Sequence, residues 1–276
     1  MALQPMDRRS GPLHRTLDVE LLAGKFHAAQ PFPHVAIHDF LDGEFAEQVA
    51  SAYPTMEQAR QLGREFQAVN ERGKVQVTAV AAFPPPLRAL KDLLASPELR
   101  DSFSRITGIP ALLADEELVG GGMHLMPPGA HLDVHVDFNR IKERGLYRRL
   151  NVLLFLSPVW EEPWGGELEL WDEQVSRREQ IFRPEFNLLV LFETSDHSFH
   201  GVRRIESPAG TARLSFAGYY YTREPPPGRR SEAHTTIFRS RPEERWKGRV
   251  LMPAERALER AHSMLRRVAR LARPRR

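Results

Sequence analysis

The first 115 residues show mainly the spacing that is typical of helices. Apolar residues recur at helical intervals in four segments, and Pro31 and Pro33 separate the first segment from the rest. A short alternation around Val35 and Ile37 indicates a strand between the first two helices. The pattern therefore predicts a strand over residues 34–40 and helices near 17–29, 42–52, 86–94 and 97–107.

From Glu117 the pattern changes to short runs that are rich in Val, Leu, Phe and Tyr. Turn-forming Pro and Gly residues separate these runs. Many strands without intervening helices indicate a sandwich or a jelly roll, with the N-terminal helices packed on one face. The chain is therefore predicted to be mainly β with flanking helices, with strands near residues 117–126, 131–138, 148–156, 166–171, 187–194, 198–204 and 212–221.

The composition is that of a folded chain. Hydrophobic residues make up 41% of 276, which is enough for a substantial core. No apolar run reaches the length of about 18 residues that a membrane span needs, and the N-terminus lacks the apolar segment of a signal peptide. We therefore expect a cytoplasmic protein without a transmembrane segment, with peripheral contact to a membrane as a further option.

Cysteine is absent from the chain. Disulfides, thiolate zinc sites, iron–sulfur clusters and cysteine nucleophiles are excluded by that absence. Any metal must then be held by nitrogen and oxygen ligands, and imidazole and carboxylate suit iron, manganese or zinc.

Candidate chemistry is concentrated at residues 131–137, which read His-Leu-Asp-Val-His-Val-Asp. Residues two apart on a strand point to the same face. Four ionisable side chains on one face would be costly in a dry core, so we expect that face to line a cavity that holds a cation. The spacing His-x-Asp begins the two-histidine, one-carboxylate set that binds non-haem iron. The four residues expected to share this face are His131, Asp133, His135 and Asp137.

A second histidine is needed to complete such a site, and two candidates follow, His197 and His200. Arg213 comes thirteen residues after His200 and could hold a carboxylate through two parallel hydrogen bonds. A 2-oxo acid that chelates the metal needs such an anchor for its far carboxylate. Ser215 lies on the same strand face as Arg213 and could add a hydroxyl donor.

Six pieces of the chain have a familiar order and spacing: 132–138, 148–156, 164–171, 189–192, 198–202 and 210–215. Through these pieces, residues 120–222 resemble the prolyl 4-hydroxylase-like branch of the 2-oxoglutarate/Fe(II) oxygenases, and in particular the ribosomal-protein prolyl hydroxylases. Residues 38–41 and 107–110 resemble that family more loosely.

The resemblance implies a double-stranded β-helix, which is a jelly-roll barrel. It implies His135, Asp137 and His200 as iron ligands, with His131 and Asp133 as neighbours and His197 either behind the ligands or on the surface. It implies Arg213 as the partner of the 2-oxoglutarate far carboxylate. The cofactors implied are Fe(II), 2-oxoglutarate as cosubstrate and O2, with ascorbate as a further candidate.

The chain departs from the family at two tyrosines. Phe155 occupies the position of one, and the region of His124 or Met126 lacks the other. We therefore expect His124 and Asn151 to substitute in the cosubstrate pocket. Phe192, Phe216 and Trp171 are candidate lining residues, although ordinary core packing is the favoured explanation for any single one of them. The charged loop at residues 139–144 is expected at the barrel mouth, either near substrate or as a solvated turn.

The favoured substrate is a prolyl residue of a peptide or protein. Because one fold hosts many reactions, a free amino acid, a sugar or a specialised metabolite is the alternative substrate. A metal-binding cupin-like scaffold without oxygenase activity is a third possibility, although such a scaffold has no need of Arg213.

The positive charge is concentrated at the C-terminus. Residues 256–276 contain eight Arg and one Glu, whereas the whole chain has a net charge of +3. Apolar residues at helical spacing make 253–276 a basic amphipathic helix, which packs on the barrel or contacts an anionic membrane or nucleic acid weakly. A protein acting only through this tail is the non-enzymatic alternative. The expected organisation is an oxygenase domain over 1–230, with helical support at 15–115 and a jelly-roll core at about 117–222, followed by a basic extension over 231–276.

Overall fold

The computed structural model describes residues 12–13, 16–227 and 232–253 of the chain. Within these residues the N-terminal part is helical, and the four predicted helices are confirmed. A further short helix, α3, has no counterpart among the predictions. The helices are α1 (Val19–Ala28), α2 (Gly43–Ser51), α3 (Met56–Leu62), α4 (Pro85–Ala95) and α5 (Pro97–Thr107).

Capping residues explain where these helices begin and end. The carboxylates of Asp18 and Asp42 accept hydrogen bonds from backbone N–H groups in the first turns of α1 and α2. Ser96 caps α5 in the same way, by accepting from the backbone N–H of Leu99. The helix α5 ends at Gly108, whose φ of 68° is accessible to glycine at little cost.

Strands are the main regular elements of the described chain beyond residue 113, and all seven predicted strands in that region are confirmed, with shifted ends. The short predicted strand in the N-terminal part is also present. The strands are β1 (His34–Ile37), β2 (Arg64–Gln67), β3 (Glu71–Val77), β4 (Leu113–Ala114), β5 (Gly122–Met126), β6 (His131–Val136), β7 (Arg140–Ile141), β8 (Leu146–Phe155), β9 (Leu168–Trp171), β10 (Arg178–Phe182), β11 (Leu189–Glu193), β12 (His200–Val202), β13 (Arg213–Thr222) and β14 (Ile237–Arg239).

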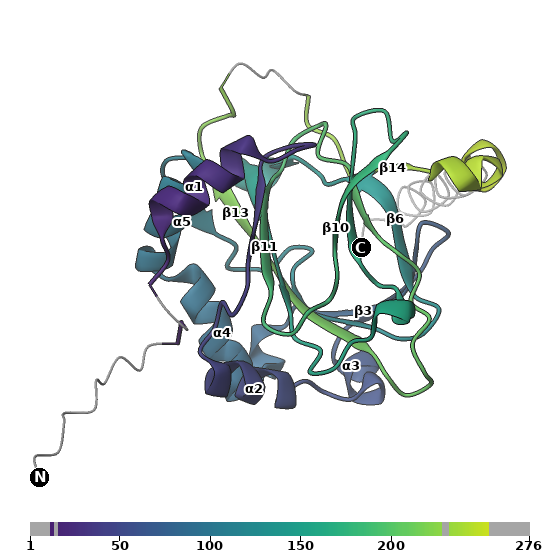
Figure 1. The fold of residues 1–276 in the computed structure, drawn as a ribbon, viewed down its shortest axis with the longest axis horizontal. Helices are drawn as coiled ribbons and strands as arrows, with labels where there is room; N and C mark the ends of the chain where they lie inside the picture. Colours follow the sequence, from purple (N-terminus) through teal and green to yellow (C-terminus); the bar gives the residue numbers. More distant parts are fainter. Residues whose placement is uncertain (1–11, 14–15, 228–231, 254–276) are drawn as a thin grey trace, which may run out of the picture.

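The strands form a jelly roll with two antiparallel faces. One face has the order β11-β8-β13-β5, and the other has the order β6-β12-β9-β10. Strand β3 joins the two faces because it pairs with β5 along one part and with β6 along another. Figure 1 shows α1, α2, α4 and α5 along one side of the strands, away from β6, β10 and β14. The predicted double-stranded β-helix with N-terminal helices is therefore confirmed.

The main hydrophobic core lies between the helices and the larger face of the barrel. Phe26, Leu90 and Phe103 from the helices belong to one buried cluster with Leu154 and Leu191 from β8 and β11. Burying side chains of this size contributes roughly 1.5–3 kcal/mol each. This packing holds the larger face in place and leaves the interior of the barrel for a site.

A β-bulge in β6 changes the expected direction of its side chains. His200 of β12 pairs with His135, but Val202, two residues on, pairs with Leu132, three residues back. One extra residue on β6 therefore breaks the two-residue alternation. As a result, Leu132 and His135 both line the interior cavity, whereas His131 lies in a separate outer cleft. The prediction that four ionisable residues share one face is wrong for this reason.

Strand β3 approaches β5 closely at a glycine. Gly122 has a φ of 87°, and a Cβ built there would lie 2.3 Å from the carbonyl oxygen of Val77. Any larger residue would push β3 away from β5. The glycine run at residues 120–122 thus lets β3 form part of the barrel wall.

The C-terminal described residues pack on the barrel across the boundary expected at residue 230. Strand β14 pairs with β6, with Phe238 opposite His135. The predicted basic helix at 253–276 lies almost wholly outside the described residues. Among the helices that the structure describes, none combines the length and the apolar character needed to span a bilayer.

Candidate metal centre

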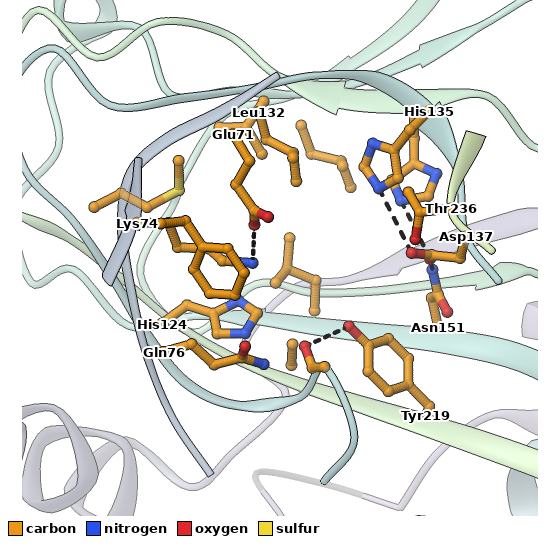
Figure 2. A pocket seen from close by; sticks show the side chains of 18 of the residues that line it. Glu71, Lys74, Gln76, His124, Leu132, His135, Asp137, Asn151, Tyr219 and Thr236 are labelled. Atoms are coloured by element: carbon orange, nitrogen blue, oxygen red, sulfur yellow. Dashed lines mark hydrogen bonds and ion pairs between the residues drawn. The ribbon is translucent and has the colours of Figure 1, made fainter. Parts of the chain in front are cut away.

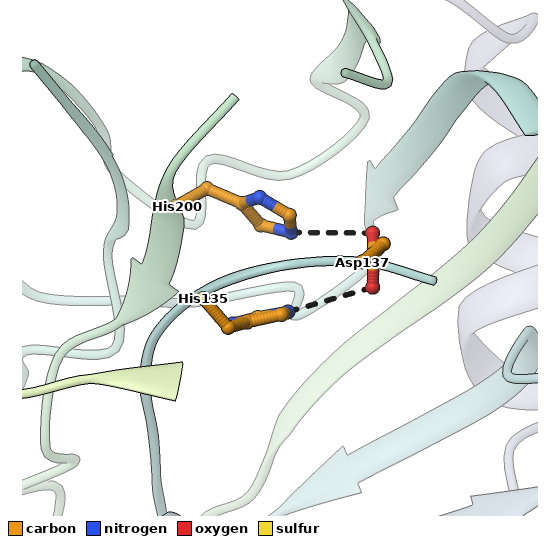
Figure 3. Close-up of side chains that lie close together, drawn as sticks. All are labelled: His135, Asp137 and His200. Atoms are coloured by element: carbon orange, nitrogen blue, oxygen red, sulfur yellow. Dashed lines mark ion pairs between the residues drawn. The ribbon is translucent and has the colours of Figure 1, made fainter. Parts of the chain in front are cut away.

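Three potential metal ligands converge inside the barrel, at the ends of β6 and β12 (Figure 3). The ligand atoms of His135, Asp137 and His200 all lie within 4.8 Å of one another. The Nε2 atoms of His135 and His200 each lie 3.5 Å from a different oxygen of Asp137. No other such group of three His or acidic residues occurs in the part of the chain that the structure describes.

Backbone carbonyls fix the orientation of both imidazoles. His135 Nδ1 lies 2.9 Å from the carbonyl oxygen of Asp133, and His200 Nδ1 lies 2.9 Å from that of Ser198. A carbonyl oxygen can only accept, so each Nδ1 carries the hydrogen and donates it. The Nε2 lone pairs are therefore directed at the shared space, as metal-binding histidines require.

The charges of the cluster suit a divalent cation. Burial, and then the neighbouring His135, lowers the pKa of His200 to about 4, so its imidazole is neutral at physiological pH. Burial alone would raise the pKa of Asp137, but Arg148 and the two histidines outweigh it and hold the pKa well below its usual range. The cluster thus offers two imidazoles and one carboxylate, which is the donor set of non-haem Fe(II) sites.

Asn151 fixes the carboxylate of Asp137. Its Nδ2 donates to Asp137 Oδ2 at 2.6 Å, and its Oδ1 accepts from Thr194 Oγ1 at 3.1 Å. Both ends of the Asn151 amide are thus engaged, by Asp137 and by Thr194. A role for Asn151 in holding the cosubstrate stays a prediction.

Arg148 is a site residue that the sequence analysis did not single out. It is buried, and its Nη1 lies 3.3 Å from Asp137 Oδ1. Its guanidinium also stacks on Tyr219, with 3.4 Å between the guanidinium carbon and the ring centroid. The tandem Arg148-Arg149 on a buried apolar strand was the signal that could have found it, because a buried charge requires a partner.

The three potential ligands line one cavity of about 270 Å³. Figure 2 shows His135, Asp137 and Asn151 toward one end, with Lys74, Gln76 and His124 toward the other. Apolar residues form much of the remaining wall. They include Phe66, Met126, Leu132, Phe138, Val152, Leu153, Leu168, Phe192, Val202 and Phe238.

Arg213 lines the same cavity with an unsatisfied charge. It is 1% exposed, and among the described residues its Nε and Nη2 have no hydrogen-bond partner. Its Nη1 donates to Ser215 Oγ at 3.3 Å, and its guanidinium lies over the ring of Phe155 at 4.7 Å. A buried cation with free donors fits a carboxylate ligand, so the cavity passes the test for a 2-oxo dicarboxylate. Ser215 supports Arg213 from behind and is not itself in the cavity wall.

His124 contributes a neutral imidazole to the cavity. Burial lowers its pKa well below the usual value, and the charges of Lys74 and Arg213 lower it further. Its Nε2 is buried without a partner among the described residues. Because Lys74 and Arg213 both act on it, His124 lies in the part of the cavity that is suited to an anion.

Two predicted neighbours of the metal site face away from it. Asp133 is fully buried against Lys247, with its carboxylate 2.8 Å from Nζ, and Arg241 lies 3.4 Å away. His131 lies 3.9 Å from Asp133. His197 pairs with Glu173 on the outside, at 2.8 Å, and is not part of the cluster.

The predicted aromatic lining is only partly present. Phe192 lines the cavity and its ring centroid lies 4.8 Å from that of His200. Phe216 instead packs in the main core against Phe83, and Trp171 packs with Val134. Of the loop at residues 139–144, no residue lines the cavity.

Several lining residues come from strands that the sequence analysis did not predict. Lys74 and Gln76 are on β3, and Thr236 and Phe238 are on or beside β14. The alternation Lys-Val-Gln-Val at residues 74–77 is a strand signal that could have found the first pair. Strand β14 is too short to carry such a signal.

Comparison with known proteins relates this fold and site to a family. The 2OG-Fe(II) oxygenase superfamily model matches residues 121–221, which contain all three potential ligands and Arg213.

Two curated relatives are prolyl hydroxylases. The chain is 40% identical over 78 residues to prolyl 3-hydroxylase OGFOD1 of Mus musculus, which covers 27% of this chain and 14% of the relative. It is 26% identical over 216 residues to prolyl 3,4-dihydroxylase OGFOD1 of Ostreococcus tauri, which covers 70% and 38%. The chain thus spans well under half the length of either relative.

Two solved structures share the fold. One is a prolyl hydroxylase of Trichoplax adhaerens in complex with a hypoxia inducible factor peptide fragment, with a TM-score of 0.54 and 18% identity over 74% of this chain and 88% of that one. The other is a prolyl-4-hydroxylase of Pseudomonas putida, with a TM-score of 0.52 and 18% identity over 72% and 97%. At these identities the similarity shows the jelly roll alone.

Proposed function

We propose that this protein is an Fe(II)- and 2-oxoglutarate-dependent dioxygenase that hydroxylates an unactivated C–H bond of a prolyl residue in a peptide or protein. One observation carries the proposal: the cluster of His135, Asp137 and His200 shares one cavity with Arg213, whose Nε and Nη2 have no partner among the described residues. The superfamily match and the prolyl hydroxylases among the relatives support it.

His135, Asp137 and His200 would hold the iron and leave coordination positions for the cosubstrate and oxygen. When bound, Fe(II) and 2-oxoglutarate supply the activation of O2 for C–H oxidation, a chemistry that the protein does not perform itself. Asn151 and Arg148 hold the Asp137 carboxylate in one orientation, so the ligand set is pre-organised before the metal binds.

Arg213 would bind the far carboxylate of 2-oxoglutarate through its free Nε and Nη2. Ser215 and Phe155 fix the guanidinium from behind, where relatives of the family often have a tyrosine hydroxyl. The neutral imidazole of His124 offers a further hydrogen bond in the same space. The hydrogen bonds from Arg213 Nε, from Arg213 Nη2 and with His124 would determine how the cosubstrate is oriented relative to the metal.

A prolyl ring suits the remaining space because much of the cavity wall is apolar. The tertiary amide of an X–Pro bond has no N–H to satisfy, so it can enter such a space at a lower desolvation cost than other peptide bonds. A small metabolite is the alternative substrate, and the Lys74–Glu71 ion pair in the cavity wall is the feature that favours a polar molecule.

The test is incubation with Fe(II), 2-oxoglutarate and a panel of prolyl peptides, followed by mass spectrometry. We expect a product heavier by one oxygen atom, formed with one succinate per hydroxylation. His135→Ala should abolish both, and His197→Ala, on the outer surface, should change neither. Turnover of a free amino acid or sugar with no peptide product would overturn the prolyl assignment while leaving the oxygenase class intact.

A further inference from the structure

Strand β14 forms part of the cavity wall although it lies beyond residues 121–221, the part that matches the superfamily model. Its residues pair with β6 in the order Ile237 with Val136, Phe238 with His135 and Arg239 with Val134. The preceding part of β6, at Leu132, pairs instead with β3. Strand β14 therefore extends the wall beside the residues that would hold the metal.

The alternation along residues 236–238, at the start of β14, directs two side chains inward and one outward. Thr236 and Phe238 line the cavity, whereas Ile237 does not and is 43% exposed. The ring of Phe238 lies 5.3 Å from that of His135, at an interplanar angle of 36°. Figure 2 shows Thr236 at the same end of the cavity as Asp137. Phe238 is only partly buried and lines the cavity, so its ring adds apolar surface to this wall.

Polar contacts hold β14 in place at both ends. Before the strand, His234 Nε2 lies 2.9 Å from Asp196 Oδ1, and its backbone N–H donates to Asn139 Oδ1 at 3.1 Å. After the strand, Arg241 donates to Glu169 at 3.0 Å and lies 3.4 Å from Asp133. A wall fixed at both ends can select a ligand by shape, because its side chains do not have to be ordered when the ligand binds.

We propose that β14 is the wall that selects the substrate, and that Phe238 packs against the ring of the target prolyl residue. The inference rests on the proposed function, since it assigns one face of that same cavity. Arg213 and His124 occupy the anion-binding part, whereas Phe238 lies against His135 and presents an apolar surface beside the metal ligands. Proline lacks a backbone N–H and is best recognised by contact with its ring.

The first test measures binding of a fluorescent prolyl peptide to the Co(II)- and 2-oxoglutarate-loaded protein. Phe238→Ala should weaken binding at least about tenfold, as expected for the apolar contact of one aromatic ring. Phe238→Leu should restore part of the loss. Ile237→Ala is the matched control, because it removes an apolar side chain from the same strand on the opposite face, and its affinity should match that of the wild type.

A second peptide, with alanine in place of the target proline, isolates the ring contact. The preference for the prolyl over the alanyl peptide should be large in the wild type and in Ile237→Ala, and should largely disappear in Phe238→Ala. Affinity for Co(II) should be unchanged in all three proteins. That readout separates substrate packing from a structural effect of Phe238 on His135.

Two results would overturn the inference. One is an unchanged preference for proline in Phe238→Ala and Phe238→Leu. The other is a loss of Co(II) affinity that matches the loss of peptide affinity, which would make Phe238 a support for the metal ligand only. If the wild type itself bound and hydroxylated no prolyl peptide, the proposed function would fail first, and this outcome is distinct from both.

Discussion

Arg213 is the residue whose environment is hardest to explain without a ligand. A guanidinium that is 1% exposed, with two donor atoms that have no partner among the described residues, is costly in a folded chain. Glu167 lies close enough to favour its charged form, but no ion pair joins the two side chains among the described residues. A carboxylate that enters the cavity would relieve this cost, which makes Arg213 the anchor for the cosubstrate.

Replacing Arg213 with Met should therefore separate binding from stability. We expect the affinity for 2-oxoglutarate, measured by calorimetry on Mn(II)-loaded protein without oxygen, to fall at least about tenfold. The free energy of unfolding of the metal-free protein should stay the same or rise, because an uncompensated buried cation is removed. A variant that loses stability and keeps its affinity would contradict this role for Arg213.

His124 makes the stability of the folded protein depend on pH. The folded state keeps this imidazole neutral, since burial and nearby cations hold its pKa well below 6.5. Below about pH 6.5 the unfolded chain takes up a proton that the folded chain excludes, so His124 lowers stability as the pH falls.

In His124→Gln, urea unfolding should show a shallower decline below about pH 6.5, by up to about 1.4 kcal/mol per pH unit. His38→Gln is the matched control, because the His38 side chain is 62% exposed. Parallel declines in the wild type and in His124→Gln would rule out the neutral, buried His124.

At the scale of elements, the bulge in β6 decides which ionisable residues reach the cavity. Alternation alone placed His131, Asp133, His135 and Asp137 on one face. The extra residue opposite β12 leaves Asp133 with Lys247 and Arg241 instead. No local feature of the sequence marks this bulge, since it arises from the register with β12.

Asp133→Asn tests this division of β6. The substitution leaves Lys247 and Arg241 with less compensating charge in a buried place, which should cost roughly 3–5 kcal/mol of unfolding free energy. The folded protein should still bind metal and 2-oxoglutarate with unchanged affinity. Glu243 is an exposed acid on the segment that carries Arg241 and Lys247, so Glu243→Gln should change neither property. Loss of metal binding without loss of stability would place Asp133 at the metal after all.

Much of the fold could be predicted from local patterns. The helices α4 and α5 have proline at their starts, and β8, β11 and β13 are apolar runs between turns. Strands β2, β10 and β14 could not be found in this way, because they are short and charged and owe their structure to pairing with β3, β9 and β6.

The candidate site shows the same limit. His135, Asp137, His200 and Arg213 follow from spacing and from the resemblance to a family. Lys74, Arg148, Thr236 and Phe238 line the same cavity but come from separate parts of the chain. These residues become neighbours only when the barrel closes, so no spacing in the sequence predicts that they lie together.

At the scale of the whole molecule, the strands of the barrel bring residues from distant parts of the chain to one cavity. Among the described residues, those that line it lie between Phe66 and Phe238. The division into an oxygenase domain and a basic extension stays a prediction, and β14 shows that the first part of that extension belongs to the barrel wall.

Removing residues 254–276 should leave the affinities for metal and 2-oxoglutarate unchanged. If the eight arginines near the C-terminus bind anionic surfaces, co-sedimentation with anionic vesicles or with RNA should be lost in the shortened chain and should weaken with salt in the full chain. A shortened chain that still co-sediments would place that contact on the barrel. Loss of 2-oxoglutarate affinity would show that the tail supports the site.

The most direct test of the iron site is anomalous diffraction at the iron absorption edge, from crystals grown without oxygen in Fe(II) and 2-oxoglutarate. The predicted result is one strong iron peak within bonding distance of His135 Nε2, His200 Nε2 and the Asp137 carboxylate, with the far carboxylate of 2-oxoglutarate on Arg213. Iron at His131 and Asp133, or no iron peak in the cavity, would contradict the account.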